Sequence, residues 1–537
     1  MRKRLAPTVP AGGHWAGWLG ISGVALLFVA LRLNNFNAPL IRDEGEYAYS
    51  AQLLLQGVAP YEHAFLQKPP MVVYSYALSG LLLPHVFWAP RLLAAGFTGL
   101  ATLLLGFIAR LEFGKGCALP AMWLVTPMLL LPRIEQFTAN TEMFMLVPLL
   151  GMVAVHCYSR QHGHQPVHWL AAGLLGVATL LYKYTALPVL AFVYAVWSVE
   201  LWRATRSTSR LWWCWCSSLA GGALAVIVLL GFFLVCDGGM RLWECTVLFN
   251  RYYAHSTNFG LAAFYQRIGE FWGDWWILFI LPWAVLLRPV ARLWFWLGIF
   301  IAALVATGAS SYGHYYLVVM PFWALLSAAG LCCLAERVAQ RRLLTPPIIK
   351  WLLIAVVMIL ICRFDAPWMA LTREQFAAAK LGGWSPFLES QTVAKRIDEL
   401  SSPSDPVYVA GSEPQILYYA QRSSPTRFIT AYALMIPSPV AQKYQQEAIR
   451  DLQEHPPALI VLATANSSWL RQATTPQDFL LFLNQLLAQN YQLVGGYVND
   501  GGNGCWTEPL DAKGLATASL VLFQRGNLPA SPSAVRP

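Results

Sequence analysis

Long apolar stretches recur along the first two thirds of the chain, and short polar loops separate them. Eleven of these stretches are each about 15–25 residues long, which is enough for a helix to cross roughly 30 Å of hydrocarbon. We expect them at 15–34, 88–109, 116–132, 142–158, 167–182, 184–201, 211–236, 273–287, 291–308, 314–334 and 348–363. The pattern predicts an α-helical polytopic membrane protein.

A further apolar stretch, 71–85, is predicted not to cross the membrane by itself. Counting it as a crossing would invert every later loop and export the arginine-rich ones. Pro69 and Pro70 favour a helix start, and Pro84 favours its end. We therefore expect a short juxtamembrane or re-entrant helix inside an outer loop at 35–87.

The pattern changes beyond residue 363, where long apolar runs give way to short ones. Strand-like segments occur at 406–410, 458–463 and 519–523, with a helical run near 478–489 between them. These are the signals of a soluble α/β domain, which we expect at 364–537.

Composition supports a membrane protein, since 57% of the residues are hydrophobic and only 12% are charged. Soluble domains carry about 25% charged residues. Lysine and arginine concentrate in alternate short loops, which predicts a cytoplasmic N-terminal tail at 1–14 and a multi-pass protein of the plasma or inner membrane. Eleven crossings then place 364–537 outside the cytoplasm. Because membrane topology accounts for the net charge of +10, we expect no nucleic-acid partner.

The ten cysteines give no sign of a zinc module, because no paired CxxC motif or neighbouring histidines accompany them. Most lie within apolar runs. Cys245 and Cys505 are expected on the outer face, where two free thiols are favoured over a disulfide.

Two polar motifs lie in the expected outer loop, Arg42–Tyr47 (RDEGEY) and Gln67–Pro70 (QKPP). A positioned carboxylate can accept the proton of an attacking hydroxyl. A lysine ammonium can bind phosphate oxygens as a point charge. The plainer interpretations are acids at a helix N-terminus and an interfacial lysine at a helix start. Together the motifs favour chemistry on a lipid phosphate.

Four further sites fall on the same predicted membrane face. They are Glu142 after Asn140-Thr141, Lys183, Arg251 among aromatic residues, and His314-Tyr315. Each has a plainer interpretation: a helix cap, a snorkelling lysine, an interfacial aromatic belt and a structural histidine. A transporter would more typically carry polar groups at the bilayer midplane. Their gathering on one face favours a surface-exposed active site.

The order of these motifs resembles the GT-C glycosyltransferases of the protein O-mannosyltransferase type, which include the bacterial aminoarabinose transferases. The family pattern D-E-x-x-Y appears as Asp43–Tyr47, and K-P-P appears as Lys68–Pro70. Glu142 matches the acid that opens the fourth span, and His314-Tyr315 matches a late H-Y pair. The resemblance covers about residues 15–335.

The resemblance implies a cell-envelope enzyme that moves a sugar from a polyprenyl-phosphate donor to a glycan, lipid or protein acceptor outside the cytoplasm. In this family the first-loop aspartate is catalytic and the K-P-P lysine contacts the lipid phosphate, which assigns these roles to Asp43 and Lys68. Glu44 would orient the catalytic site, and Arg251 would share the phosphate. The expected substrate-binding set is completed by Tyr47, Glu142, Lys183, His314 and Tyr315.

Gln67 departs from the aminoarabinose transferases, which carry a glutamate tied to a metal site at this position. An amide is a poorer ligand for a divalent cation than a carboxylate. We therefore expect no cofactor or metal, and the sugar and acceptor stay open. Two other functions remain as alternatives: a transporter or flippase of lipid-linked sugars, and a non-catalytic receptor built on the C-terminal domain.

Overall fold

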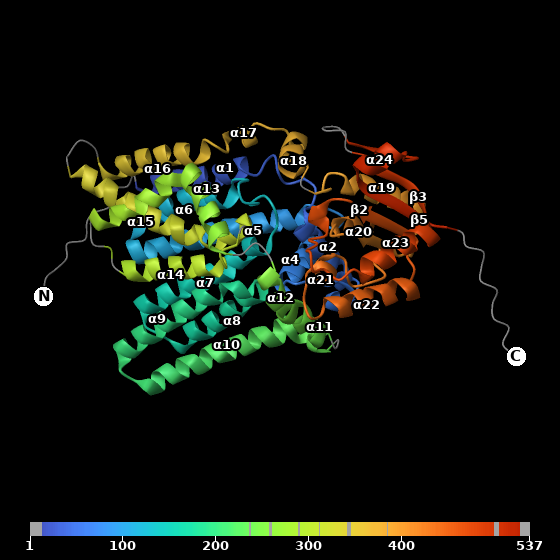
Figure 1. The fold of residues 1–537 in the computed structure, drawn as a ribbon. Coiled ribbons are helices and arrows are strands. Elements are labelled where there is room, and N and C mark those ends of the chain that lie inside the picture. Colours follow the sequence, from blue (N-terminus) through green and yellow to red (C-terminus); the bar gives the residue numbers. More distant parts are fainter. Residues whose placement is uncertain are drawn as a thin grey trace.

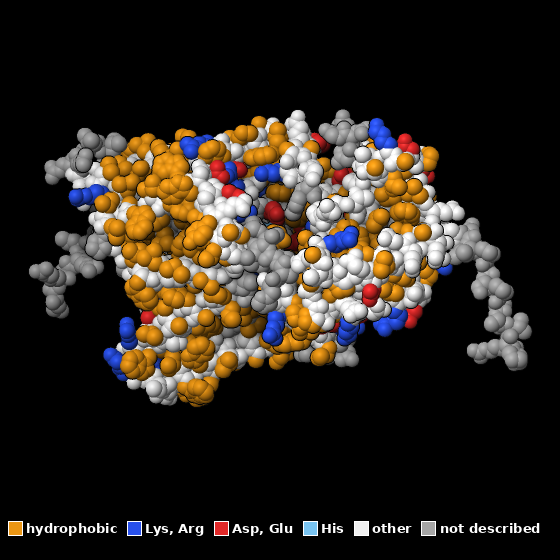
Figure 2. Space-filling model, viewed as in Figure 1, with side chains coloured by type: hydrophobic (Ala, Val, Ile, Leu, Met, Phe, Trp, Pro, Cys, Tyr) orange, Lys and Arg blue, Asp and Glu red, His pale blue; other side chains and the backbone are white. Residues whose placement is uncertain are grey.

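The computed structural model describes residues 13–235, 238–256, 260–287, 290, 292–310, 312–340, 345–383, 385–498 and 504–526. The chain forms a bundle of long helices with an α/β domain docked on one end (Figure 1). Nearly all of the expected tail at 1–14 lies outside the described residues. In the space-filling view, apolar side chains cover most of the bundle, and a hollow containing acidic side chains separates it from the C-terminal domain (Figure 2).

Each expected span contains a helix. The helices are α1 (Gly13–Ala30), α5 (Ala89–Phe113), α6 (Lys115–Leu130), α7 (Thr141–His162), α8 (Pro166–Tyr182), α9 (Leu187–Thr205), α10 (Thr208–Val235), α13 (Leu261–Ile280), α14 (Leu293–Ala306), α15 (Met320–Ala339) and α16 (Pro346–Cys362). In the described part of the chain, six helical segments are long and apolar enough to cross a membrane by length and composition. The other five spans hold shorter apolar helices. The predicted polytopic helical fold is confirmed.

The eighth span starts earlier than the sequence pattern predicts. We expected it at 273–287, whereas α13 begins at Leu261 and continues through η3 (Leu281–Leu287). The apolar pattern missed this start because charged residues lie in the first turns of the helix. They are paired: Arg267 contacts Glu270 at 2.5 Å, and Asp274 forms an ion pair with Arg133.

The tenth span starts later than expected. Residues Gly313–Val318 form a 3-10 turn, η4, and α15 begins only at Met320, with Pro321 in its first turn. His314 and Tyr315 therefore lie in a tight turn before the helix rather than on it. This turn directs both side chains toward the outer loop.

Three short helices fill the outer loop between α1 and α5: α2 (Arg42–Leu55), α3 (Pro60–His63) and α4 (Met71–Leu82). The twelve residues of α4 rise only about 18 Å, short of the roughly 30 Å hydrocarbon core. As expected, α4 starts directly after Pro70 and ends before Pro84. A second outer segment holds α11 (Gly239–Trp243), η2 (Glu244–Leu248) and α12 (Phe249–Ser256).

The C-terminal domain has a five-stranded sheet in the order β1-β2-β5-β3-β4. Its strands are β1 (Val407–Ala410), β2 (Leu459–Ala463), β3 (Tyr491–Val498), β4 (Cys505–Thr507) and β5 (Ala518–Arg525). β1 and β2 pair in parallel, and the other pairs are antiparallel. The three expected strands and the expected helix, α23 (Asp478–Asn490), are present. The sequence pattern did not predict β3 and β4, because Gly495, Gly496 and a bulge interrupt the alternation of β3.

The remaining helices of this domain are α17 (Ala366–Met369), α18 (Arg373–Leu381), α19 (Ser390–Leu400), α20 (Gln415–Ala420), α21 (Tyr432–Met435), α22 (Ala441–Glu454) and α24 (Ala512–Thr517). The domain and the bundle share one hydrophobic core. Phe65 of the outer loop packs 5.6 Å from Phe428 and 5.4 Å from Tyr444, between ring centroids. Arg427 joins Glu244 of η2 to Glu447 of α22.

Gly45 allows the closest approach between the two parts. A Cβ atom at this position would lie 2.5 Å from the backbone nitrogen of Gln415 in α20. The absence of a side chain therefore lets α2 lie directly against the C-terminal domain.

Both cysteines predicted on the outer face are free thiols. Cys245 is buried in η2, and Cys505 is exposed on β4.

Candidate functional site

Asp43 and Lys68 line one cavity of about 210 Å³ between the bundle and the C-terminal domain. The outer loop contributes Arg42, Asp43, Gln67 and Lys68; the bundle contributes Glu135, His314 and Tyr315; and the C-terminal domain contributes Phe387, Tyr432, Ser467 and Leu470. Four of the predicted site residues, Asp43, Lys68, His314 and Tyr315, are thus brought together at this cavity.

Asp43 is the acid of the RDEGEY motif that faces the cavity. It lies in the first turn of α2, where the helix dipole favours a negative charge. Its side chain is partly exposed, whereas Glu44 and Glu46 are 0% and 2% exposed. Of these three carboxylates, Asp43 is the one that lines the cavity.

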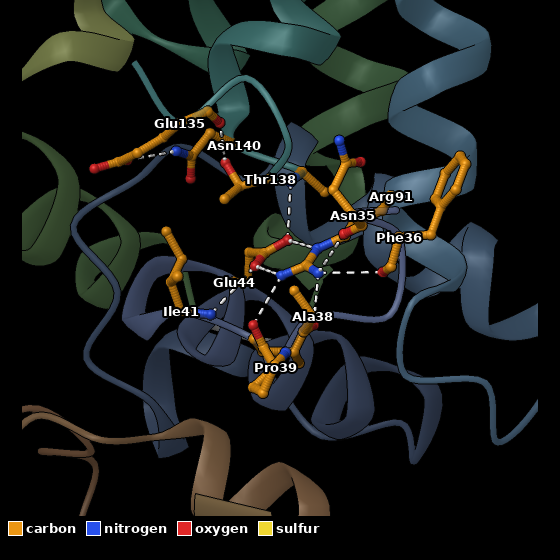
Figure 3. A network of polar contacts seen from close by, with 12 residues as sticks. Asn35, Phe36, Ala38, Pro39, Ile41, Glu44, Arg91, Glu135, Thr138 and Asn140 are labelled. Atoms are coloured by element: carbon orange, nitrogen blue, oxygen red, sulfur yellow. Dashed lines mark hydrogen bonds and ion pairs between the residues drawn. The ribbon is translucent and has the colours of Figure 1, made fainter. Parts of the chain in front are cut away.

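Glu44 is buried in the protein interior, where Arg91 of α5 binds its carboxylate (Figure 3). Arg91 donates from Nε to Oε1 at 2.8 Å and from Nη2 to Oε2 at 2.5 Å. The backbone amides of Ala139 and Ile41 donate to the same carboxylate at 2.9 and 3.2 Å. The other N–H groups of Arg91 bond to the carbonyls of Phe36, Ala38 and Pro39. Glu44 therefore does not reach the cavity, and it fixes the start of α2 and hence Asp43.

The backbone on either side of Lys68 is fixed by two neighbouring elements. Tyr61 donates to the carbonyl of Lys68 at 2.7 Å, and Asn250 donates to the carbonyl of Gln67 at 2.7 Å. Burial opposes the charge on Lys68, but the neighbouring Tyr315 and Asp43 raise its pKa above the usual value. The lysine is therefore a stable cation at the cavity wall.

Tyr315 lines the cavity and also contacts a buried ion pair. Lys183, at the end of α8, bonds to Glu142 in the first turn of α7, and both are less than one tenth exposed. The ammonium nitrogen of Lys183 lies 3.1 Å from the centroid of the Tyr315 ring, and that of Lys68 lies 5.9 Å from it. Glu142 and Lys183 are thus close to the cavity without lining it.

His314 forms an ion pair with Glu135, with 2.8 Å between Nδ1 and Oε2. Asn140 donates to the same carboxylate at 3.3 Å. Burial alone would lower the pKa of His314, but Glu135 and Glu142 outweigh it and raise the pKa. These two carboxylates therefore favour the protonated form of His314, which lines the cavity together with Lys68 and Arg42.

Besides Glu44, Glu142 and Lys183, two further predicted residues do not line the cavity. Tyr47 is 1% exposed and packs edge-on against Tyr76, with 5.5 Å between ring centroids. Arg251 is exposed on α12 and does not line the cavity, whereas Tyr253 of the same helix does. The aromatic part of this helix, rather than its arginine, faces the site.

The sequence pattern gave no sign of the cavity wall that the C-terminal domain supplies. Arg42 connects the two sides, because it bonds to the Ser412 carbonyl at 2.5 Å and to Glu413 at 2.8 Å. Its guanidinium also lies 5.5 Å from the centroid of the Tyr432 ring. The position of Arg42 next to Asp43 was the one available signal; Tyr432 and Phe387 belong to no recognisable motif.

Among the described residues, no group of three or more His, Cys, Asp or Glu side chains is arranged to hold a metal ion. Gln67 lines the cavity where a carboxylate would be the better metal ligand. The predicted absence of a metal stays a prediction.

No protein-family model and no curated protein sequence matches this chain. Solved structures do. The structure of ArnT from Cupriavidus metallidurans bound to undecaprenyl phosphate matches with a TM-score of 0.58 and 16% identity, over 95% of this chain and 98% of that one. The oligosaccharyltransferase AglB from Archaeoglobus fulgidus matches with a TM-score of 0.53 and 12% identity, over 93% and 75%. The mycobacterial arabinofuranosyltransferase AftD matches with a TM-score of 0.50 and 14% identity, over 98% of this chain and 40% of that one. These likenesses confirm the expected architecture: the chain is a multi-pass membrane protein with the GT-C fold.

Proposed function

We propose that this protein is an integral-membrane glycosyltransferase that moves a sugar from a polyprenyl-phosphate donor to a glycan, lipid or protein acceptor. The observation that carries the proposal is the convergence of Asp43 and Lys68 on one cavity at the end of the bundle. Among the proteins of similar fold, ArnT was solved with undecaprenyl phosphate and AglB with a dolichol-phosphate and an inhibitory peptide. We place the cavity and the C-terminal domain on the extracytoplasmic side and the N-terminus in the cytoplasm.

An apolar groove next to the cavity would hold the polyprenyl chain. It has a volume of about 260 Å³ and is lined by α13, α14, η4 and α15, including Phe264, Phe300 and Tyr316. The groove and the cavity share no lining residue, but Tyr316 of the groove directly follows Tyr315 of the cavity in η4. A lipid chain in this groove would bring its phosphate to Lys68.

Asp43 would act as the general base. The acceptor hydroxyl attacks the anomeric carbon while Asp43 takes its proton, and the bond from that carbon to the phosphate oxygen breaks. The polyprenyl phosphate leaves with the bonding electron pair, and Lys68 stabilises its growing negative charge. Attack from the face opposite the phosphate inverts the anomeric carbon.

The other residues would shape the pocket for sugar and acceptor. The Glu142–Lys183 pair holds the Tyr315 ring through the contact with Lys183, and His314 adds a polar group at the wall. We assign the donor phosphate to Lys68 rather than to Arg251, because Arg251 is exposed outside the cavity. No step requires a metal ion.

The test is turnover of undecaprenyl-phosphate-linked pentose and hexose donors by purified full-length protein, with mass spectrometry of the products. Asp43→Asn should lower kcat by about 10²–10⁴-fold, the usual contribution of a general base. Asp398→Asn is the matched control, because the Asp398 side chain is 70% exposed. Unchanged turnover in Asp43→Asn would exclude the catalytic assignment of Asp43. Absence of any transfer product with the wild type would instead favour a flippase.

A second measurement separates binding from chemistry. Lys68→Gln should weaken the binding of undecaprenyl phosphate by about tenfold, since it removes a charge-assisted contact. Asp43→Asn should leave that affinity close to the wild-type value. Equal losses of affinity in both variants would contradict the separate roles.

A further inference from the structure

A larger groove lies on the side of the bundle, between α1 and α5. Its volume is about 540 Å³, and its lining is apolar except near one end. Val29 and Leu103, which line it, are each 54% exposed, so the groove opens to the surface that faces the bilayer. It shares no lining residue with the cavity that contains Asp43 and Lys68.

Arg32 lies at the end of this groove, in the turn that follows α1. It is only 2% exposed, and its Nε and Nη2 atoms have no hydrogen-bond partner. A buried guanidinium with two unpartnered nitrogen atoms is costly, so its presence in a membrane protein points to an anionic ligand.

The charges around Arg32 do not balance. Its charged neighbours are Arg91 and Glu44, and the carboxylate of Glu44 is already bound by Arg91 (Figure 3). Two buried cations therefore share one anion. An anion next to Arg32 would therefore stabilise its charged form.

We propose that this groove binds an anionic glycerophospholipid, with the acyl chains along α1 and α5 and the phosphate on Arg32. The apolar lining matches hydrocarbon chains, and a single uncompensated cation matches a lipid with one negative charge. A polyprenyl-phosphate donor does not suit this groove, because its phosphate must reach Lys68 in a separate cavity. The bound phosphate would also offset the repulsion between Arg32 and Arg91, and Arg91 holds the loop after α1 in place.

The test measures the binding of phosphatidylglycerol and phosphatidylcholine to delipidated full-length protein by native mass spectrometry. Wild type should bind phosphatidylglycerol about tenfold more tightly, as expected for a charge-assisted contact. Arg32→Gln should remove this preference. Gly96→Leu should weaken the binding of both lipids, because Gly96 lines the groove and the leucine side chain would occupy its space. A Cβ atom at this position meets nothing within 4 Å.

Two control variants leave the groove intact. Arg363→Gln removes an exposed arginine after α16, and Gly231→Leu adds a side chain to open space on α10. Both should bind the lipids as wild type does, and all four variants should bind undecaprenyl phosphate normally if they fold. Equal binding of the two lipids by wild type, or a retained preference in Arg32→Gln, would overturn the proposal. Loss of undecaprenyl-phosphate binding in Arg32→Gln would also overturn it and assign the groove to the donor.

Discussion

At the scale of single residues, neighbouring carboxylates of one motif have different surroundings. Successive residues on a helix point about 100° apart, so Asp43 faces the cavity while Glu44 faces Arg91. The sequence identified both as site residues because the motif carries no information about which face is buried. The bonds of Glu44 to α5 and to the loop before α7 became visible only in three dimensions.

Arg91→Met should destabilise the protein by about 3–5 kcal/mol, because it leaves the buried Glu44 carboxylate without its cation. Thermal or SDS-induced unfolding, followed by tryptophan fluorescence, measures the loss. Arg363→Met is the control, since Arg363 is exposed. An unfolding curve equal to that of wild type would show that the Glu44–Arg91 pair contributes nothing net.

Glu46 should make stability fall as pH rises. Burial, with the nearby Asp43, raises its pKa to about 8, whereas an unfolded glutamate titrates near about 4.3. Between these pH values the folded state keeps a proton that the unfolded state has lost, so the free energy of unfolding decreases by up to about 1.4 kcal/mol per pH unit.

The measurement is the unfolding of wild type and Glu46→Gln at pH 5 to 8. The variant should show a flatter pH dependence over this range and should be more stable than wild type at pH 8. Glu454→Gln, at an exposed position, should keep the wild-type slope. If the free energy of unfolding of Glu46→Gln fell with pH as steeply as that of wild type or more steeply, Glu46 would not be protonated in the folded state.

At the scale of elements, the helices followed the apolar pattern closely, and the errors occurred where polar residues find partners. The start of α13 was missed because Arg267 and Glu270 precede the apolar run, and the sequence does not reveal that they pair with each other. The turn η4 was taken as helix because its residues are apolar and aromatic. The sequence pattern did not predict β3, because its glycines fit a bulge rather than a strand of alternating polar and apolar residues.

Gly45→Ala should weaken the contact between α2 and α20. Alanine is the better helix former, but its Cβ would meet the backbone of Gln415, and overpacking of this kind costs about 1–3 kcal/mol. Limited proteolysis of the C-terminal domain should therefore proceed faster in the variant. Gly96→Ala, where the added Cβ meets open space, is the control. Slower cleavage of Gly45→Ala would show that the higher helix propensity of alanine outweighs the clash of its Cβ with the Gln415 backbone.

At the scale of the whole molecule, the cavity depends on segments from both ends of the chain. The half formed by the outer loop and the bundle was predictable, because Asp43, Lys68 and His314 lie near span ends and topology puts them on one face. The other half was not, because no local pattern in 364–537 indicates which of its surfaces docks on the bundle.

Cys505 offers a direct test of orientation. It is an exposed thiol on β4, and we place its domain outside the cytoplasm. A membrane-impermeant maleimide should therefore label intact spheroplasts that express the protein, and Cys505→Ser should lose most of that labelling. Labelling of Cys505 only after permeabilisation would place the C-terminal domain in the cytoplasm.

The docking of Phe387, Tyr432 and Leu470 over Asp43 has a consequence for biosynthesis. The ribosome completes all eleven spans before it makes these three residues, so the newly inserted bundle has an open, unfinished pocket. The pocket closes only after the C-terminal domain has folded onto the bundle. If the protein is the extracytoplasmic glycosyltransferase that we propose, a nascent chain in the membrane is inactive toward lipid-linked sugars until this domain has been exported and has folded.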